Sequence, residues 1–137
     1  MVVKSGGGYN ELIASAINSF SRSHLEKHIS KINKKLKTKR DAMLTSLSEN
    51  LSGIGNWNQP KGGLYLWLKM PDSINLSQIQ QLAFDANIGY LSGNIFAADQ
   101  NSGQNFARLC FGYNTPEEID SGISQLTKIL ENEGHIS

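Results

Sequence analysis

The sequence predicts an α+β fold: a two-layer domain with a small, mostly antiparallel sheet, helices on one face of that sheet and a long N-terminal helix. Three observations predict it. Apolar residues recur at helical spacing in four segments, they alternate with period two over residues 64–70, and no repeat or linker divides the chain. A length of 137 residues is also that of a single domain.

The N-terminal third is predicted to contain two helices. Apolar residues at helical spacing indicate a first helix over about residues 10–20. Residues 23–26 then resemble a capping box, in which the Ser23 hydroxyl and the Glu26 carboxylate would open a second helix. That helix is expected to run for about seven turns, to near Asn50. Its apolar positions are Leu25, Ile29, Ile32, Leu36, Met43 and Leu47.

Residues 64–70 are predicted to form a strand with two different faces. Leu64, Leu66, Leu68 and Met70 share one face, which we expect to pack against helices. The opposite face is half-apolar, and we expect it to meet another domain or subunit. It carries Tyr65, Trp67 and Lys69.

The remaining elements follow in order. A cap at Asn75 predicts a helix to about Ala86, and short strands are expected over residues 88–91 and 106–111. Thr115 followed by Pro116 and two glutamates indicates the start of a last helix. The positions expected to face inward are Ile79, Leu82, Ala83 and Ala86 in the first of these helices, and Ile119, Ile123, Leu126 and Leu130 in the last.

The net charge of +1 conceals two unlike halves. Residues 1–71 hold 11 Lys and Arg against 4 Asp and Glu, whereas residues 72–137 hold 2 against 8. Most of the positive charge lies in one run, which we interpret as a solvated helix face. Nucleic-acid binding is disfavoured because no aromatic residue is interleaved with the basic ones. The run comprises Lys27, Lys31, Lys34, Lys35, Lys37, Lys39 and Arg40.

Composition excludes several classes of protein. No apolar run approaches the roughly 18 residues of a membrane helix, and the N-terminus lacks the apolar stretch of a secretory signal. With a single cysteine, Cys110, no internal disulfide can form, so a cytoplasmic location is expected. Cys110 lies within an apolar strand and is predicted to be a buried structural thiol.

Two short motifs predict no chemistry of their own. The glycines at residues 6–8 precede a helix but lack the Lys-Ser or Lys-Thr pair of a phosphate-binding loop. His24 and His28 stand one helical turn apart, but no third ligand follows at a suitable spacing. We therefore predict no metal site, and a solvent-facing histidine pair.

Arg108 is the most informative residue. It lies in a strand whose neighbouring side chains are apolar on both faces, so we expect a strand buried on both sides. An unpaired guanidinium there would be costly, and a carboxylate partner is therefore expected. That partner is either an acidic side chain of the same domain or a ligand, and an edge position reaching solvent is a third possibility.

Four segments together resemble the C-terminal small domain of class I/II aminotransferases, in the fold-type-I superfamily that uses pyridoxal 5'-phosphate (PLP). Their order matches that of the family, and the resemblance extends from about Gly6 to Leu130. Ser92 departs from the pattern, because the family commonly has proline there. The matching segments are residues 39–44, 60–68, 88–96 and 107–119.

The resemblance implies that Arg108 binds the α-carboxylate of an amino-acid substrate. It also implies that Tyr9, Asn10, Gly62 and Gly63 line the active-site cleft. In the family, the lysine that binds PLP belongs to a large domain upstream, and nothing in this chain matches its motif. Residues 1–137 are therefore expected to be a fragment that lacks the large domain, binds no PLP and has no catalytic residue of its own.

The intact enzyme is expected to be a PLP-dependent homodimer that transfers an amino group between an amino acid and a 2-oxo acid. Two alternatives remain. The same type of domain ends PLP-binding transcription regulators, behind a winged-helix DNA-binding segment. A stand-alone binding module built on the basic helix is the other, and its affinity for nucleic acid would fall steeply with salt.

Overall fold

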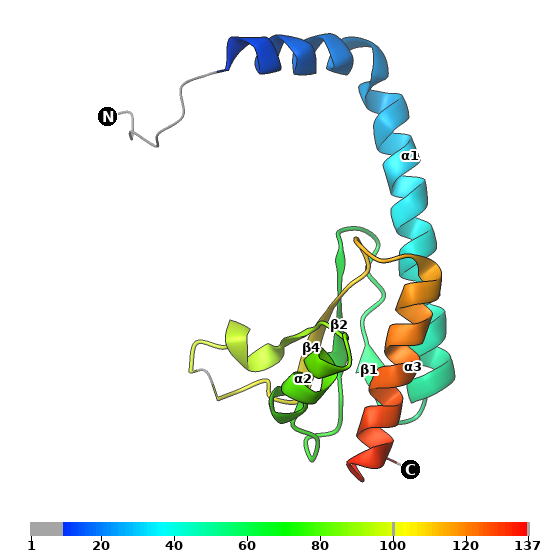
Figure 1. Ribbon diagram of the computed structural model, residues 1–137, viewed down its shortest axis with the longest axis vertical. Coiled ribbons are helices and arrows are strands. Elements are labelled where there is room, and N and C mark those ends of the chain that lie inside the picture. The colour runs from blue at the N-terminus through cyan, green and yellow to red at the C-terminus, as the bar shows by residue number, and fades with distance from the viewer. Residues whose placement is uncertain (1–9, 100, 137) are drawn as a thin grey trace. The chain divides into compact units, whose positions relative to one another are not determined.

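The computed structural model describes residues 10–99 and 101–136. The chain divides into two compact units, Met1–Lys35 and Leu36–Ser137, of which the second contains the sheet. Figure 1 shows the arrangement of the elements and labels most of them. They are the helices α1 (Glu11–Leu51), α2 (Leu76–Asp85) and α3 (Pro116–Asn132), the strands β1 (Asn56–Trp57), β2 (Tyr65–Lys69), β3 (Leu91–Ser92) and β4 (Phe106–Cys110), and the 3-10 helix η1 (Gly93–Phe96).

α1 is one continuous helix of 41 residues, so the prediction of two helices was wrong. Ser23 lies inside it and caps nothing. Neither glycine nor proline occurs between residues 11 and 51, and a single serine in a helix costs only about 0.5 kcal/mol relative to alanine. The helix begins instead at Asn10, whose side-chain oxygen accepts a hydrogen bond from the amide of Ile13 at 3.1 Å.

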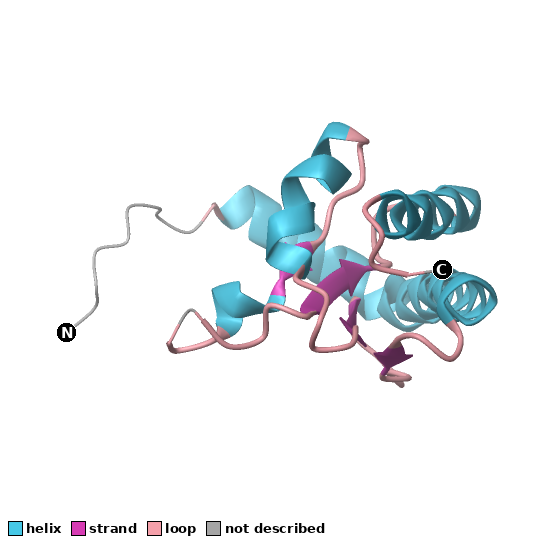
Figure 2. Ribbon diagram, turned by 90° about the horizontal axis from the view of Figure 1, so that it is seen from below, coloured by secondary structure: helices cyan, strands magenta, loops and turns pink. Residues whose placement is uncertain are grey.

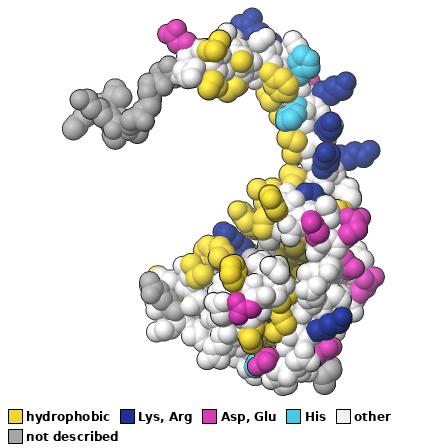
Figure 3. Space-filling view, viewed as in Figure 1, with side chains coloured by type: hydrophobic (Ala, Val, Ile, Leu, Met, Phe, Trp, Pro, Cys, Tyr) yellow, Lys and Arg dark blue, Asp and Glu magenta, His cyan; other side chains and the backbone are white. Residues whose placement is uncertain are grey.

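The first unit exposes its apolar side chains. Leu12 is 81% exposed and Ile17 60%, and the apolar positions Leu25, Ile29 and Ile32 are exposed as well. Apolar side chains gather along one side of this part of α1, and lysines project from another side (Figure 3). Residues 10–35 therefore form an amphipathic helix whose apolar side is not covered by any described residue.

The four strands form an antiparallel sheet in the order β1-β2-β4-β3. In the central pair, Trp67 lies opposite Arg108 and Leu66 opposite Leu109. The sequence analysis did not identify β1, which has only two residues. β3 comprises Leu91 and Ser92, so the predicted strand over residues 88–91 was placed too early.

One face of the sheet is covered by helices, as predicted. Leu66, Leu68 and Ala107 have no exposed surface, and Met70 is 1% exposed. Leu64 precedes β2 and is 40% exposed, so it is not buried with the other three residues predicted on this face. In Figure 2 the α-helices that pack on the sheet lie to one side of the strands, and the short helix η1 lies on the other side. Their side chains complete a single core: Met43, Leu47 and Leu51 from α1, Ile79 and Ala83 from α2, and Ile119, Ile123, Leu126 and Leu130 from α3.

Both predicted caps at the later helices are confirmed. The Asn75 side chain accepts hydrogen bonds from the amides of Ser77 and Gln78. Thr115 and Glu118 form a reciprocal capping box at the start of α3. The inward positions of α3 were correct. Leu82 of α2 is exposed, and Ala86, which caps the C-terminal end of that helix, is exposed too, so both were wrongly predicted to face inward.

Part of the basic run is engaged within the domain. Lys39 donates hydrogen bonds to the backbone carbonyls of Gly112 and Tyr113, at 3.2 and 2.9 Å. Arg40 is half-buried and bonds both the Asp41 carboxylate and the carbonyl of Pro60. Hydrogen bonds from Lys37 and Arg40 lower the pKa of Asp41. A uniformly solvated basic face was therefore the wrong interpretation for Lys39 and Arg40.

Candidate functional site

The face of the sheet opposite the helices carries the candidate site. Side chains alternate along β2 and β4, so the residues between the buried leucines point to this outer face. Trp67, Phe106 and Arg108 are half-buried there, and Tyr65 and Cys110 are exposed. The expectation that β4 is buried on both sides was wrong. Cys110 is a free, exposed thiol rather than a buried one, because no described residue covers its end of the strand.

Arg108 lies against two aromatic rings. Its guanidinium carbon is 4.1 Å from the centre of the Tyr65 ring and 4.6 Å from the centre of the Phe96 ring. Both distances are within the roughly 6 Å over which a cation is attracted to an aromatic face. Tyr65 reaches Arg108 from the neighbouring strand, and Phe96 comes from η1. The two rings therefore hold the guanidinium without neutralising it.

The polar edge of this guanidinium remains available. Ion pairs among the described residues join Lys37 and Arg40 to Asp41, and Lys69 to Asp72, but none includes Arg108. Likewise, the guanidinium of Arg108 makes no hydrogen bond to any residue that the structure describes, although the Arg108 backbone pairs with both neighbouring strands. Stacking occupies the flat face of a guanidinium, whereas its five N–H donors lie in the plane and point outward. Of the three alternatives given for Arg108, an acidic side-chain partner is therefore not found within the described residues, which leaves a ligand carboxylate or a position that reaches solvent.

The position of Phe96 depends on two glycines. A Cβ atom on Gly93 would lie 2.6 Å from the Cβ of Phe106, and it would also collide with the carbonyl of Gly103. Gly103 itself has φ = +76°, a conformation that favours glycine. The start of η1 thus rests directly on the turn that leads into β4, and this contact places Phe96 above the outer face.

The turn before β4 is held by Asp99. Its carboxylate accepts hydrogen bonds from the Ser102 hydroxyl at 2.6 Å and from the amides of Asn101 and Ser102. These hydrogen bonds, chiefly that of the Ser102 side chain, lower the pKa of Asp99. The turn is therefore fixed by local hydrogen bonds close to the residues that contact η1.

The other predicted site residues are only partly brought to Arg108. Gly62 and Gly63 precede β2 and lie next in the chain to the strand that carries Tyr65, with Gly63 at φ = +82°. Asn10 belongs to the other compact unit and caps α1. Tyr9, like the glycines at residues 6–8, lies outside the described residues. Gly62, Gly63 and Asn10 therefore make no described contact with the Arg108 guanidinium.

The histidine pair forms a small aromatic cluster in the first unit. His24 stacks on Phe20 with 5.3 Å between ring centres, and His28 meets the same ring edge-on at 5.5 Å. Both histidines are exposed, as predicted. The described residues contain no group of three or more metal-binding side chains.

Phe96 is the functional residue that sequence reasoning did not identify. The alternation in residues 64–70 was sufficient to place Tyr65 and Trp67 on the face away from the core, whereas residues 106–111 were expected to be buried on both sides. It could not indicate that η1 folds back over this face. A signal existed in Gly93 and Gly103, since paired glycines at turns permit close backbone contact, but their pairing cannot be read from spacing alone.

Sequence comparisons connect this fold to known proteins. No protein-family model matches the chain. Aromatic-amino-acid aminotransferase 1 of Thermococcus litoralis is 34% identical over 110 residues, which cover 80% of this chain and 26% of the relative. An uncharacterized HTH-type transcriptional regulator of Bacillus subtilis, YdfD, is 31% identical over 112 residues, covering 82% and 23%. The chain thus spans about a quarter of the length of these relatives.

Aminotransferases of known structure also match the fold of this chain. A kynurenine aminotransferase from Pyrococcus horikoshii superimposes with a TM-score of 0.75 and 34% identity, over 82% of this chain and 28% of the other. A multiple substrate aminotransferase from Thermococcus profundus gives a TM-score of 0.76 at 29% identity, over 83% and 28%. The fold and these relatives identify the family as the PLP-dependent aminotransferases of fold type I. The chain belongs to this family and corresponds to a fragment of its fold.

The described residues do not fit the cofactor of this family. A lysine that forms a Schiff base with PLP needs an enclosed site beside a cup for the phosphate. Every described lysine is exposed except Lys39, whose ammonium group already bonds two backbone carbonyls. No chemistry of the cofactor is therefore assigned to residues of this chain.

Proposed function

We propose that residues 1–137 are the C-terminal small domain of a PLP-dependent aminotransferase, and that Arg108 binds the α-carboxylate of its substrates. The intact enzyme would transfer an amino group between an amino acid and a 2-oxo acid, both of which carry that carboxylate. The observation that supports this role is the guanidinium itself: it is held by Tyr65 and Phe96, and it has no carboxylate partner among the described residues.

The geometry suits orientation more than simple attraction. Two parallel N–H···O bonds from a guanidinium fix the plane of a carboxylate, which a lysine ammonium cannot do. A hydrogen bond of this charged kind contributes roughly 1.5–3 kcal/mol. Because Tyr65 and Phe96 restrict the guanidinium in advance, less rotational freedom is lost when the substrate binds.

The rest of the site would come from a large domain outside these residues, and PLP would bind there. The exposed apolar side of α1 over residues 10–35 and the half-apolar outer face of the sheet both support contact with further protein. We propose that these surfaces meet the large domain or the second subunit of a homodimer. The exposed free thiol of Cys110 is compatible with a reducing, cytoplasmic compartment.

The test is substitution of Arg108 in the full-length protein that contains this chain. With Arg108→Lys, we expect kcat/KM for the amino acid to fall about 10- to 100-fold, because the charge remains but the bidentate geometry is lost. Lys69→Gln is the matched control, since it removes a cation from the same outer face and should change kcat/KM less than about twofold. An unchanged kcat/KM in Arg108→Lys would refute the role.

The isolated 137-residue protein is expected neither to bind PLP covalently nor to transaminate. No described lysine is enclosed, so addition of PLP followed by borohydride should label lysines weakly and at several positions. Peptide mapping by mass spectrometry provides the measurement. Stoichiometric labelling of one lysine would contradict the proposal that the cofactor site belongs to another domain.

A second candidate function is supported by the two Bacillus subtilis relatives described as HTH-type transcriptional regulators. In that case the domain would be the effector part of a PLP-binding regulator, and the same Arg108 would bind the effector's carboxylate. The full-length protein distinguishes the two functions. An enzyme converts an amino acid and a 2-oxo acid with many turnovers, whereas a regulator shows ligand-dependent binding to DNA and no turnover.

A further inference from the structure

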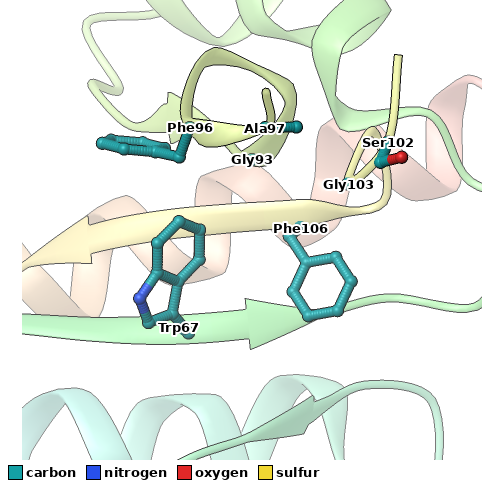
Figure 4. A pocket seen from close by; sticks show the side chains of 7 residues that line it. All are labelled: Trp67, Gly93, Phe96, Ala97, Ser102, Gly103 and Phe106. Carbon is teal, nitrogen blue, oxygen red and sulfur yellow. The ribbon is translucent and has the colours of Figure 1, made fainter. Parts of the chain in front are cut away.

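A cavity of about 320 Å³ opens on the outer face of the sheet, beside Arg108. Figure 4 shows Trp67 on β2 and Phe106 on β4 next to each other, with Phe96 facing them from η1. The Trp67 ring meets the Phe96 ring edge-on, with 5.3 Å between centres, and the Phe106 ring at 6.5 Å. The lining residues are Trp67, Gly93, Phe96, Ala97, Ser102, Gly103 and Phe106, none of them charged.

The cavity adjoins the proposed carboxylate site and shares the Phe96 ring with it. Trp67 lies directly opposite Arg108 in the β2–β4 ladder, on the same face of the sheet. Phe96 belongs to both sites, because its ring lines the cavity and lies 4.6 Å from the guanidinium carbon. A ligand whose carboxylate binds Arg108 can therefore extend its side chain across Phe96 into the cavity.

We infer that this cavity binds the side chain of the substrate, and that the preferred substrates are aromatic amino acids and aromatic 2-oxo acids. The inference rests on the proposed function of Arg108. The volume of the cavity lies at the lower end of the range of about 300–1,000 Å³ typical of ligand sites, which suits one ring better than a larger group. Edge-to-face contact with Trp67 and Phe106 favours an aromatic ring over an aliphatic chain of equal size.

An acidic side chain fits this site less well. Besides Arg108, a described cation near the cavity is Lys69, 5.6 Å from the centre of the Phe106 ring, and Asp72 lies 4.0 Å from its ammonium group. A second carboxylate placed in the cavity would lose its hydration against three aromatic rings and gain no unpaired cation. The cavity therefore favours substrates with an aromatic side chain and disfavours dicarboxylate substrates.

The experiment uses the 137-residue protein and two-dimensional ¹H–¹⁵N NMR. The indole signal of Trp67 reports the cavity, that of Trp57 on β1 serves as an internal control, and the side-chain signal of Arg108 reports the carboxylate site. The probes are propionate, 3-phenylpropionate and glutarate. We expect 3-phenylpropionate to shift Trp67 and Arg108 together and to bind about tenfold or more tightly than propionate. Glutarate should bind no more tightly than propionate.

Two matched variants separate the cavity from the guanidinium. Ala97→Leu should fill the cavity and reduce the affinity for 3-phenylpropionate to that of propionate, whereas Ala98→Leu, one residue away and outside the lining, should leave it unchanged. Arg108→Gln should weaken both monocarboxylates about tenfold or more. Unchanged backbone spectra away from the substitution establish that each variant is folded.

The outcomes distinguish a failure of this inference from a failure of the proposed function. Equal binding of propionate and 3-phenylpropionate, both lost in Arg108→Gln, would overturn the aromatic preference and leave the carboxylate role intact. Binding of 3-phenylpropionate that is unchanged in Arg108→Gln would overturn the carboxylate role, and the inference with it. Tight binding of glutarate with a shift at Lys69 would instead assign an acidic substrate class and overturn the inference.

Discussion

The two faces of the same sheet show how one pair of strands can serve stability and binding separately. On the inner face, Leu66, Leu68 and Ala107 have no exposed surface and pack into the helices. On the outer face, Tyr65 and Arg108, each adjacent in sequence to a buried residue, remain partly open and face one another. Because side chains alternate along a strand, neither face restricts the composition of the other.

The difference shows where this domain is incomplete. The inner face is complete, since its apolar side chains form one core with α1, α2 and α3. The outer face leaves aromatic rings half-exposed and a guanidinium without a counter-ion among the described residues. Substitutions on the inner face should therefore reduce stability, and those on the outer face should reduce binding.

The largest expected effect on stability tests this contrast within two adjacent residues. Leu66→Ala should lower the free energy of unfolding by about 3 kcal/mol, because it leaves a cavity in the core. Tyr65→Ala, which removes a ring that is 44% exposed, should cost less than about 1 kcal/mol. Urea unfolding followed by circular dichroism measures both. Equal losses would show that the outer face contributes to the core as well.

A smaller effect is expected where the helix layer begins. Thr115→Ala removes the hydroxyl that accepts from the Glu118 amide, and it should cost about 1 kcal/mol of unfolding free energy. Thr115→Ser keeps that oxygen and should cost much less. Thermal unfolding of the two variants is the measurement, and an equal loss in both would indicate that packing of the threonine methyl group, rather than the cap, is what matters.

The smallest effect should come from the first unit. Ile17→Gln replaces an apolar side chain that is 60% exposed, so the free energy of unfolding should change by no more than about 0.5 kcal/mol in the 137-residue protein. If the full-length protein covers this side of α1, the same substitution should weaken it considerably more there. Comparable changes in both proteins would contradict contact between residues 10–35 and further protein.

The inner face was largely predictable from the sequence. Period-two alternation identified Leu66, Leu68 and Met70, and a cap, a proline and a regular stripe identified α3, because these signals are local and agree with one another. The continuous α1 was missed because Ser23 and Glu26 have the spacing of a capping box. Such a pattern caps a helix only where the preceding helix ends, and α1 has no break at Ser23. Cap residues are tolerated inside helices when no glycine or proline ends the preceding turn.

The candidate site was only half predictable. An arginine among apolar neighbours in one strand was enough to single out Arg108, and the absence of an acidic partner could be established only from coordinates. The ring of Phe96 reaches Arg108 through a contact between segments about ten residues apart that have no periodic pattern. Irregular turns of this kind are determined by tertiary packing, which spacing in the sequence does not report.

The contact between Gly93 and Gly103 also sets the dimensions of the cavity. Because neither glycine has a side chain, the η1 segment approaches the turn before β4 closely, and the cavity between η1 and the rings of Trp67 and Phe106 is correspondingly shallow. A side chain on Gly93 would collide with the carbonyl of Gly103 and with Phe106, so the two segments would have to shift and the shape of the cavity between them would change. The proposed preference for planar side chains would therefore depend on Gly93 and Gly103, and a substitution at either could alter it while the three aromatic rings stay the same.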